Sequence, residues 1–269
     1  MIWSRRLLTA SCFSMGLALL PVLAFAQEQD TTVADRPSEA PKATIATETP
    51  TLAFAHSAFG VSAGTVGGAG YGEATGAFRG ERPSLGGGLR AWGAPIDWLT
   101  LFVDAERRDE ASNRRFAPSA SVQGRILGDR AAGWALSGLV RYKADGFADL
   151  GGEMEFAVLG SYARRGFHLD GNVIVGAGFE EGESDGELLA RIGYDVLPYL
   201  RIGGEGRLRY RLSGDASLPG GRAADVYLGP QLLGYYGAFF AAVSGGPSTI
   251  GIADGAGWFA LASIGGAAF

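Results

Sequence analysis

Apolar and charged residues alternate strictly along residues 200–210, whose sequence is LRIGGEGRLRY. Leu200 and Ile202 occupy one set of alternate positions, and Arg201 and Arg209 occupy the other. A period of two places the two kinds of side chain on opposite faces of an extended strand, whereas a helix with about 3.6 residues per turn would mix them. The segment is therefore predicted to be a β-strand with one apolar and one charged face.

The same alternation recurs along the chain between turn-forming residues, which predicts an all-β protein. Transmembrane barrels have even strand numbers, so a further strand is predicted in the glycine-rich stretch, around Gly67–Phe78. The fold class is thus an antiparallel transmembrane β-barrel of about 12 strands, with 10 or 14 as alternatives. The other strands are predicted at Leu85–Trp92, Trp98–Glu106, Ala117–Leu127, Trp134–Lys143, Asp149–Tyr162, Phe167–Phe179, Glu187–Tyr194, Tyr199–Leu212, Ala223–Gly234, Gly237–Ser244 and Gly257–Phe269.

The connections between these strands alternate between tight turns and longer polar loops. Tyr235–Tyr236 is predicted to be a tight turn, and Arg107–Phe116 is predicted to be a longer loop. In outer-membrane barrels the tight turns face the periplasm and the longer loops face outward. The alternation therefore also predicts the orientation of the barrel.

The chain divides into three parts. Met1–Ala26 has a basic start, an apolar run and an A-x-A site, which predict a signal peptide cleaved after Ala26. Residues 27–50, rich in Thr, Ala, Glu and Pro, predict a flexible periplasmic arm. Residues 51–269 then form the barrel. The sequence after the predicted signal peptide contains no run of about 18 apolar residues, so no membrane-spanning helix is predicted. A closed barrel is then the structure that could cross a membrane.

Energy decides which face of the strands meets lipid. An arginine at mid-bilayer on the lipid side costs about 2 to 4 kcal/mol, and several on one strand would match a typical folding stability of about 5 to 15 kcal/mol. The charged face must therefore line the lumen. Aromatic residues at the ends of the apolar face predict girdles, with Trp134, Tyr162, Phe167 and Tyr194 at the periplasmic edge and Tyr142, Phe179 and Tyr210 at the outer edge.

The lumen charges predict how the strands pair. Directly opposed residues of an antiparallel pair have a constant sum of position numbers, so one register can be tested against several charges. The predicted lumen pairs are Glu187–Arg209, Arg191–Glu205 and Asp195–Arg201 for a sum of 396, Arg141–Glu155 and Lys143–Glu153 for a sum of 296, and Arg211–Asp225 for a sum of 436.

The sum of 436 has a further consequence. It places Arg209 beside Tyr227, and together with the sum of 396 it leaves Arg207 between Leu189 and Gly229 with no local carboxylate. Arg207, Arg209, Arg211 and Tyr227 are therefore candidates for contact with a small anionic solute, and simple lumen packing is the alternative.

Composition excludes several kinds of chemistry. The formal net charge of −5 argues against a nucleic-acid partner. Cys12, the one cysteine, lies in the predicted signal peptide, which leaves the mature chain without a thiol. His56 and His168 are the two histidines, so no metal site, cofactor or catalytic residue is predicted.

A signal peptide, alternating strands and a last strand that ends in Phe269 come together in this chain. In these features it resembles the outer-membrane β-barrel proteins of Gram-negative bacteria. The resemblance implies a location in the bacterial outer membrane, in contact with its lipid and lipopolysaccharide. It also implies that the barrel assembly machinery reads Phe269 as part of its signal. No narrower family is identified.

The expected function is a narrow, non-enzymatic channel or solute-uptake protein with an ion-paired lumen. The alternative is a closed barrel with a structural or surface-interaction role and no transport. A membrane-embedded hydrolase is the third interpretation. Outer-membrane phospholipases and lipid A deacylases carry a serine two positions after a histidine, whereas Asp170 follows His168 here.

Overall fold

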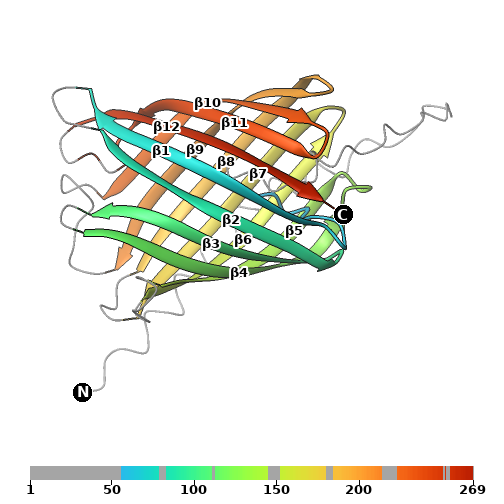
Figure 1. Ribbon diagram of the computed structural model, residues 1–269, viewed down its shortest axis with the longest axis horizontal. Coiled ribbons are helices and arrows are strands. Elements are labelled where there is room, and N and C mark those ends of the chain that lie inside the picture. The colour runs from blue at the N-terminus through green and yellow to red at the C-terminus, as the bar shows by residue number, and fades with distance from the viewer. Residues whose placement is uncertain are drawn as a thin grey trace. The chain divides into compact units, whose positions relative to one another are not determined.

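The computed structural model describes residues 56–78, 83–110, 113–144, 152–179, 184–213, 223–250, 252 and 255–268. The predicted signal peptide, the predicted periplasmic arm and Phe269 lie outside these residues. The described chain forms a closed antiparallel barrel of twelve strands, in which β1 pairs with both β2 and β12 (Figure 1). The predicted all-β barrel and its strand count are therefore confirmed. Among the described residues, no helix is long and apolar enough to cross a membrane.

The strands are β1 (Val66–Ala77), β2 (Ser84–Ile96), β3 (Leu99–Glu110), β4 (Asn113–Asp129), β5 (Trp134–Ala144), β6 (Gly152–Arg164), β7 (Phe167–Gly178), β8 (Ser184–Leu197), β9 (Leu200–Ser213), β10 (Ala224–Tyr236), β11 (Phe239–Ser248) and β12 (Gly257–Ala268). Each strand is hydrogen-bonded to the strand that follows it in the sequence, so consecutive strands are also neighbours in the barrel. We call the end where β1 begins and β12 ends the turn end, and the opposite end the loop end.

Two predicted connections are wrong. β10 continues through Tyr235–Tyr236, and the turn lies at Gly237, whose φ of 57° is a conformation that favours glycine. β3 reaches Glu110 and β4 begins at Asn113, so most of the predicted loop Arg107–Phe116 is paired strand. Charged residues indicate that a segment is near water, but they do not interrupt backbone pairing, and this is why polarity misplaced the loop.

Side chains alternate between the lumen and the outer surface along each strand. On β10, Asp225 and Tyr227 are buried inside the barrel, whereas the side chains of Val226 and Leu228 are exposed outside it. The outer surface is largely apolar, and many buried lumen residues are charged or polar. This distribution is the reverse of that in a water-soluble globular protein, and it agrees with the predicted face assignment.

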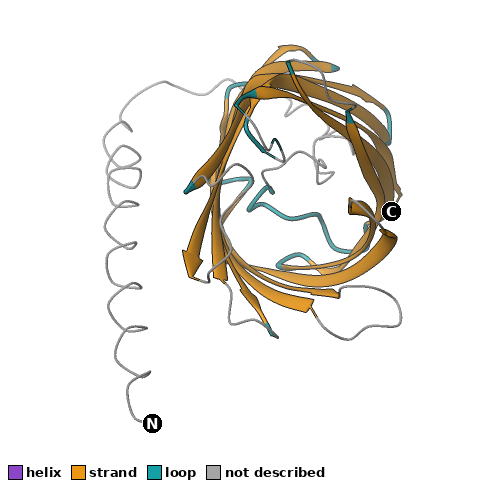
Figure 2. Cartoon of the chain, turned by 90° about the vertical axis from the view of Figure 1, so that its left-hand side faces the viewer, coloured by secondary structure: helices purple, strands orange, loops and turns teal. Residues whose placement is uncertain are grey.

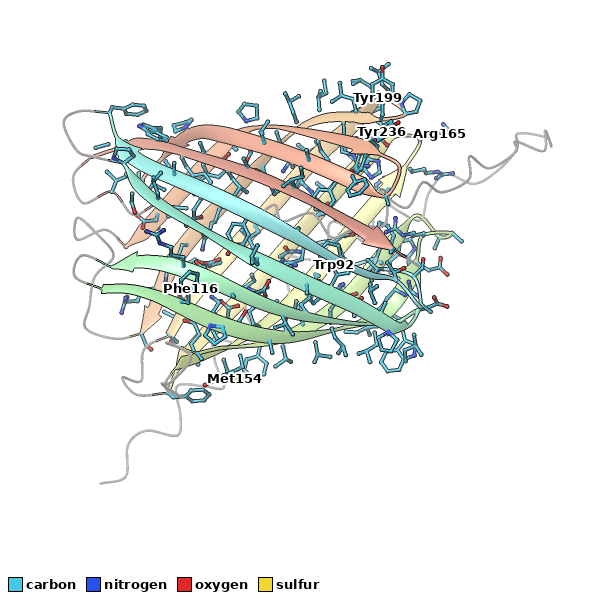
Figure 3. All side chains as sticks on the ribbon, viewed as in Figure 1. Trp92, Phe116, Met154, Arg165, Tyr199 and Tyr236 are labelled. Carbon is cyan, nitrogen blue, oxygen red and sulfur yellow. The ribbon has the colours of Figure 1, made fainter. Side chains whose placement is uncertain are left out.

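The predicted girdle residues lie near strand ends. The rings of Tyr162 and Phe167 are 6.2 Å apart at the turn end, and those of Tyr142 and Phe179 are 6.2 Å apart at the loop end. Phe179 directly follows β7, and the remaining three residues lie on strands: Trp134 is opposite Tyr162, Tyr194 is opposite Phe167, and Tyr210 is opposite Gly186. Figure 3 shows two further exposed aromatic residues at the turn end, Tyr199 and Tyr236.

Glycines make room for large lumen side chains. A Cβ atom on Gly67 would lie 2.4 Å from the Trp92 ring, and one on Gly88 would lie 2.8 Å from the Tyr71 ring. Trp92 is directly opposite Gly67, and Gly88 is directly opposite Tyr71. The glycine-rich β1 therefore has a packing role, because aromatic rings of the lumen fill the space above its backbone.

Candidate functional site in the lumen

Two of the three registers predicted from charge are observed. β8 pairs with β9 at the sum of 396, and β5 pairs with β6 at the sum of 296. The directly opposed lumen residues are Glu187–Arg209, Arg191–Glu205, Asp195–Arg201, Arg141–Glu155 and Lys143–Glu153.

The third predicted register is wrong by two residues. β9 and β10 pair at a sum of 434, which places Asp225 opposite Arg209 and Tyr227 opposite Arg207. Arg211 is therefore not opposite Asp225. The residue directly opposite Arg211 on β8 is Asp185. A slip of two keeps every side chain on its own face. Because three successive alternate positions of β9 are arginine (Arg207, Arg209 and Arg211), the charge of Asp225 is matched in either register.

The prediction that Arg207 has no local carboxylate is also wrong. Arg207 lies opposite Leu189, as predicted, but its guanidinium forms an ion pair with Glu187, two positions along β8. Arg209 follows the same diagonal, with its Nη2 2.7 Å from Oδ2 of Asp185. Arginine is long enough to reach a diagonal neighbour, so direct opposition alone does not identify its partner.

Other lumen charges form pairs along the same wall. Arg191 Nη2 lies 2.6 Å from Asp170 Oδ2 on β7, and the opposed Glu205 accepts a hydrogen bond of 3.0 Å from Gln231 Nε2. Arg201 Nε lies 2.7 Å from Asp195 Oδ1. Further contacts join Arg141 to Glu155 at 3.1 Å, Lys143 to Glu153 at 3.2 Å, Lys143 to Glu155, and His168 Nε2 to Asp195 Oδ2 at 2.7 Å.

Exposure of these pairs changes along the barrel. The Arg191 and Asp170 side chains are each 6% exposed, whereas Arg209 and Asp185, nearer the loop end, are 39% and 20% exposed. A pocket lined in part by Glu73 also opens at the loop end. The charged wall is therefore accessible to water at the loop end and buried around Arg191.

A segment that precedes β1 covers this buried part of the wall. Residues 56–65, called here the inner segment, fold into the barrel, and Figure 2 shows loop chain lying within the ring of strands. Val61 packs in a buried cluster with Trp92, and Ala58 and Phe59 pack in a second cluster with Leu159. These clusters involve different parts of the wall, so the inner segment bridges the lumen.

Side chains of four strands bind the main chain of the inner segment. Ala58 N–H donates to Ser161 Oγ at 2.7 Å, and Ser137 Oγ donates to Ala58 C=O at 2.5 Å. Asn172 binds both the N–H and the C=O of His56. Gln123 Nε2 donates to the carbonyl of Ser57 at 2.9 Å. The main-chain groups of His56 and Ala58 are thus satisfied by the barrel wall, as burial requires.

The ring of His56 reaches the charged wall. Arg141 Nη2 lies 3.0 Å from His56 Nε2, and because a guanidinium can only donate, Nε2 accepts this hydrogen bond. Arg141 also donates to Glu155. The ring packs edge-on against Phe102, with the ring centroids 6.1 Å apart. His56 therefore joins the inner segment to the ion pairs of β5 and β6.

The sequence did not predict this part of the site. The inner segment has no strand or helix period, although His56, Phe59 and Val61 depart from the polar composition of the preceding residues. Of the alternating residues His168, Asp170 and Asn172, the last binds the inner segment directly and Asp170 supports Ser161. No group of three or more His, Cys, Asp or Glu side chains that could hold a metal ion occurs among the described residues.

No family model matches the sequence, and no curated protein matches it. The fold is similar to a solved structure described as a NanC porin, with a TM-score of 0.53 and 9% identity, over 76% of this chain and 98% of that chain. A bacterial polysaccharide outer membrane secretin gives a TM-score of 0.43 and 7% identity, over 74% of this chain and 97% of that chain. The likeness to the porin concerns the fold alone, and at that level the resemblance to outer-membrane β-barrel proteins is confirmed.

Proposed function

We propose that this chain is a narrow outer-membrane channel or solute-uptake protein without enzymatic activity. The observation that carries the proposal is the two-signed charged wall of β5–β9, whose exposure increases from Arg191 to Arg209. Charges that are paired yet reach water line a path for small polar solutes at the loop end. Arg207 and Arg209 remain the proposed contacts for an anionic group, with Arg211 beyond them, whereas Tyr227, opposite Arg207, is buried against Phe259.

The outer surface supports a location in the membrane. Exposed apolar side chains such as Leu228 would cost free energy in water, at about 25 cal/mol per Å² of apolar surface, and lipid would cover them. Aromatic residues near both ends suit the two headgroup regions. The proposal therefore includes a signal peptide cleaved after Ala26, contact with lipid and lipopolysaccharide, and recognition of Phe269 by the barrel assembly machinery.

The second candidate is a closed barrel with a structural or surface-interaction role. It is favoured by one observation, namely that Ala58 and Phe59 are buried in an apolar cluster inside the lumen. A channel requires that the inner segment leave a path or move, whereas a structural barrel requires neither. If the inner segment is loosened, the channel should therefore conduct ions, whereas the closed structural barrel should not.

Planar-bilayer recording tests the channel. The unaltered protein and Ala58→Glu are compared, because a charged side chain would not fit the apolar cluster around Ala58. Ala63→Glu is the matched control, since Ala63 is exposed on the same segment. Single-channel conductance from the unaltered protein, or from Ala58→Glu but not Ala63→Glu, supports the channel. Absence of conductance from all three proteins would favour the closed barrel.

A further inference from the structure

The wall of β4–β7 contacts the inner segment in the way that a binding site contacts a peptide. Four side chains from four successive strands bind main-chain groups of residues 56–58, and we call them the peptide wall: Gln123, Ser137, Ser161 and Asn172. Main-chain hydrogen bonds give affinity for any peptide, while side-chain pockets select its sequence. Recognition of this kind does not require that the peptide belong to the same chain.

The peptide wall is held in place by groups outside the inner segment. Ser161 Oγ donates to Asp170 Oδ1 at 2.5 Å, and Asp170 is in turn bound by Arg191 through both Nε and Nη2. This donation leaves the lone pairs of Ser161 Oγ available to accept the N–H of Ala58. Ser161, Asp170 and Arg191 are all buried, so the acceptor is oriented by the barrel itself.

Two neighbouring positions set the preference for side chains. Ala58 is fully buried in a cluster that includes Leu139, Leu159 and Leu189, where a larger residue would not fit. Phe59 lies in the same cluster, and the Arg130 guanidinium is 5.2 Å from its ring centroid. The site therefore suits a small residue followed by an aromatic one. Gly60 comes next with a φ of 67°, so glycine is favoured at the third position.

We propose that the peptide wall is a binding site for a short peptide with a small–aromatic–glycine sequence, which residues 58–60 occupy in cis. The ligand class follows from the main-chain contacts, the small apolar pocket and the positive φ that comes after it. The site goes beyond the proposed channel and does not depend on conductance. A barrel that never conducts would still bind such a peptide once the inner segment has left the wall.

The test uses the full chain with Ala58→Glu, which leaves all four residues of the peptide wall unchanged. Phe59→Asp serves as a second variant if the first does not fold. The probe is a fluorescent peptide with the sequence of residues 56–62, blocked at both ends, and binding is measured by anisotropy in detergent. Hydrogen exchange at residues 56–60 reports whether the inner segment has left the wall. The matched control is the same peptide with a methyl group on the nitrogen of Ala58, which removes the donor to Ser161.

The expected result is binding to the variant that is at least about tenfold tighter than binding to the unaltered protein, in which the site is occupied. The methylated peptide should bind the variant about tenfold more weakly, because one buried hydrogen bond is lost. Equal binding of both peptides would overturn the proposal, as would absence of binding to a variant whose inner segment is released. The proposal would also be overturned if the inner segment stayed on the wall in both folded variants, since a separate peptide could then not take its place.

Discussion

The side-chain amide of Asn172 binds the main chain of His56 at two points. Its Oδ1 accepts the N–H of His56 at 2.5 Å, and its Nδ2 donates to the C=O of the same residue at 2.9 Å. Both residues are buried, so neither main-chain group can exchange this partner freely for water. This pair joins the inner segment to β7 near the middle of the lumen.

Replacing Asn172 by Asp should loosen the inner segment. The carboxylate keeps an acceptor for the N–H of His56 but places an oxygen, without a donor, against its carbonyl. We expect the free energy that holds the inner segment against the wall to fall by about 1 to 3 kcal/mol, because the buried carbonyl of His56 is left without a donor. Hydrogen exchange followed by mass spectrometry should show faster exchange at residues 56–60. Ser119→Ala is the control, since Ser119 donates to Asp104 and not to the segment. Equal exchange in the two variants would contradict this role of Asn172.

Replacing Glu187 by Gln should make the lumen more selective for anions. Glu187 neutralises Arg207 and lies 3.8 Å from Arg209, so its removal leaves an excess positive charge on β9. Two unit charges about 4 Å apart in water interact by about 1 kcal/mol. For an anion that passes the unpaired arginine, this energy corresponds to roughly a fivefold change in relative permeability. Reversal potentials in a salt gradient measure this ratio. Arg207→Gln should shift it in the opposite direction, and Asp129→Asn, at a tight turn, should leave it unchanged. A reversal potential that is the same for Glu187→Gln and the unaltered protein would argue against ion flow along this wall.

Replacing Gly67 by Val should prevent normal closure of the barrel. Its Cβ would lie 2.4 Å from the Trp92 ring and 2.7 Å from the carbonyl oxygen of Gly266 on β12. Overpacking of this kind typically costs about 1 to 3 kcal/mol, and here it falls at the seam where the first strand meets the last. Gly124→Val is the matched control, because nothing lies within 4 Å of a Cβ atom at Gly124. The yield of folded barrel and its β-sheet circular dichroism signal should fall for Gly67→Val and not for Gly124→Val. Equal yields of the two variants would show that space at Gly67 is not needed for closure.

Replacing Leu228 by Arg should destabilise the barrel in a depth-dependent way. Leu228 lies on the outer face within β10 and is 65% exposed. Arginine at the bilayer midplane costs about 2 to 4 kcal/mol, but only about 0 to 1 kcal/mol near the interface. Leu212→Arg, close to the loop end of β9, should therefore be tolerated far better. Urea unfolding in lipid vesicles compares the two variants, and equal destabilisation would be inconsistent with a lipid-covered surface.

Residue alternation was sufficient to predict most strands and their faces, because the outward positions are largely apolar, although the lumen also takes large apolar residues such as Phe259 and Leu261 on β12. Charge pairing was sufficient for the register of β8 and β9, because Glu205 is the one acidic residue of β9 and is opposite Arg191 in only one alignment. It failed for β9 and β10, where Arg207, Arg209 and Arg211 offer equivalent partners to Asp225. Diagonal pairing of Arg207 with Glu187 was also missed, since it depends on how far each side chain reaches.

The inner segment was not predicted because its contacts are not periodic. Residues 56–58 are held by side chains that lie between 66 and 116 positions away along the sequence, and only the closed barrel brings these together. Ser137 and Ser161 have no sequence feature that separates them from other small wall residues. The part of the site that binds main chain therefore required the fold, whereas the residues of the charged wall and two of its registers did not.

The inner segment is covalently and structurally continuous with β1. Gly64 N–H donates to the carbonyl of Ala94, and Ala94 N–H donates to the carbonyl of Thr65, so pairing with β2 already begins within the segment. Once displaced, residues 56–60 thus stay within a few residues of the wall, at an effective concentration in the millimolar range. Re-entry is a unimolecular event whose rate is independent of protein concentration. A competing molecule in solution must therefore either bind much more tightly than the tethered residues or be supplied at millimolar levels, which makes the unaltered barrel resistant to chance occupation.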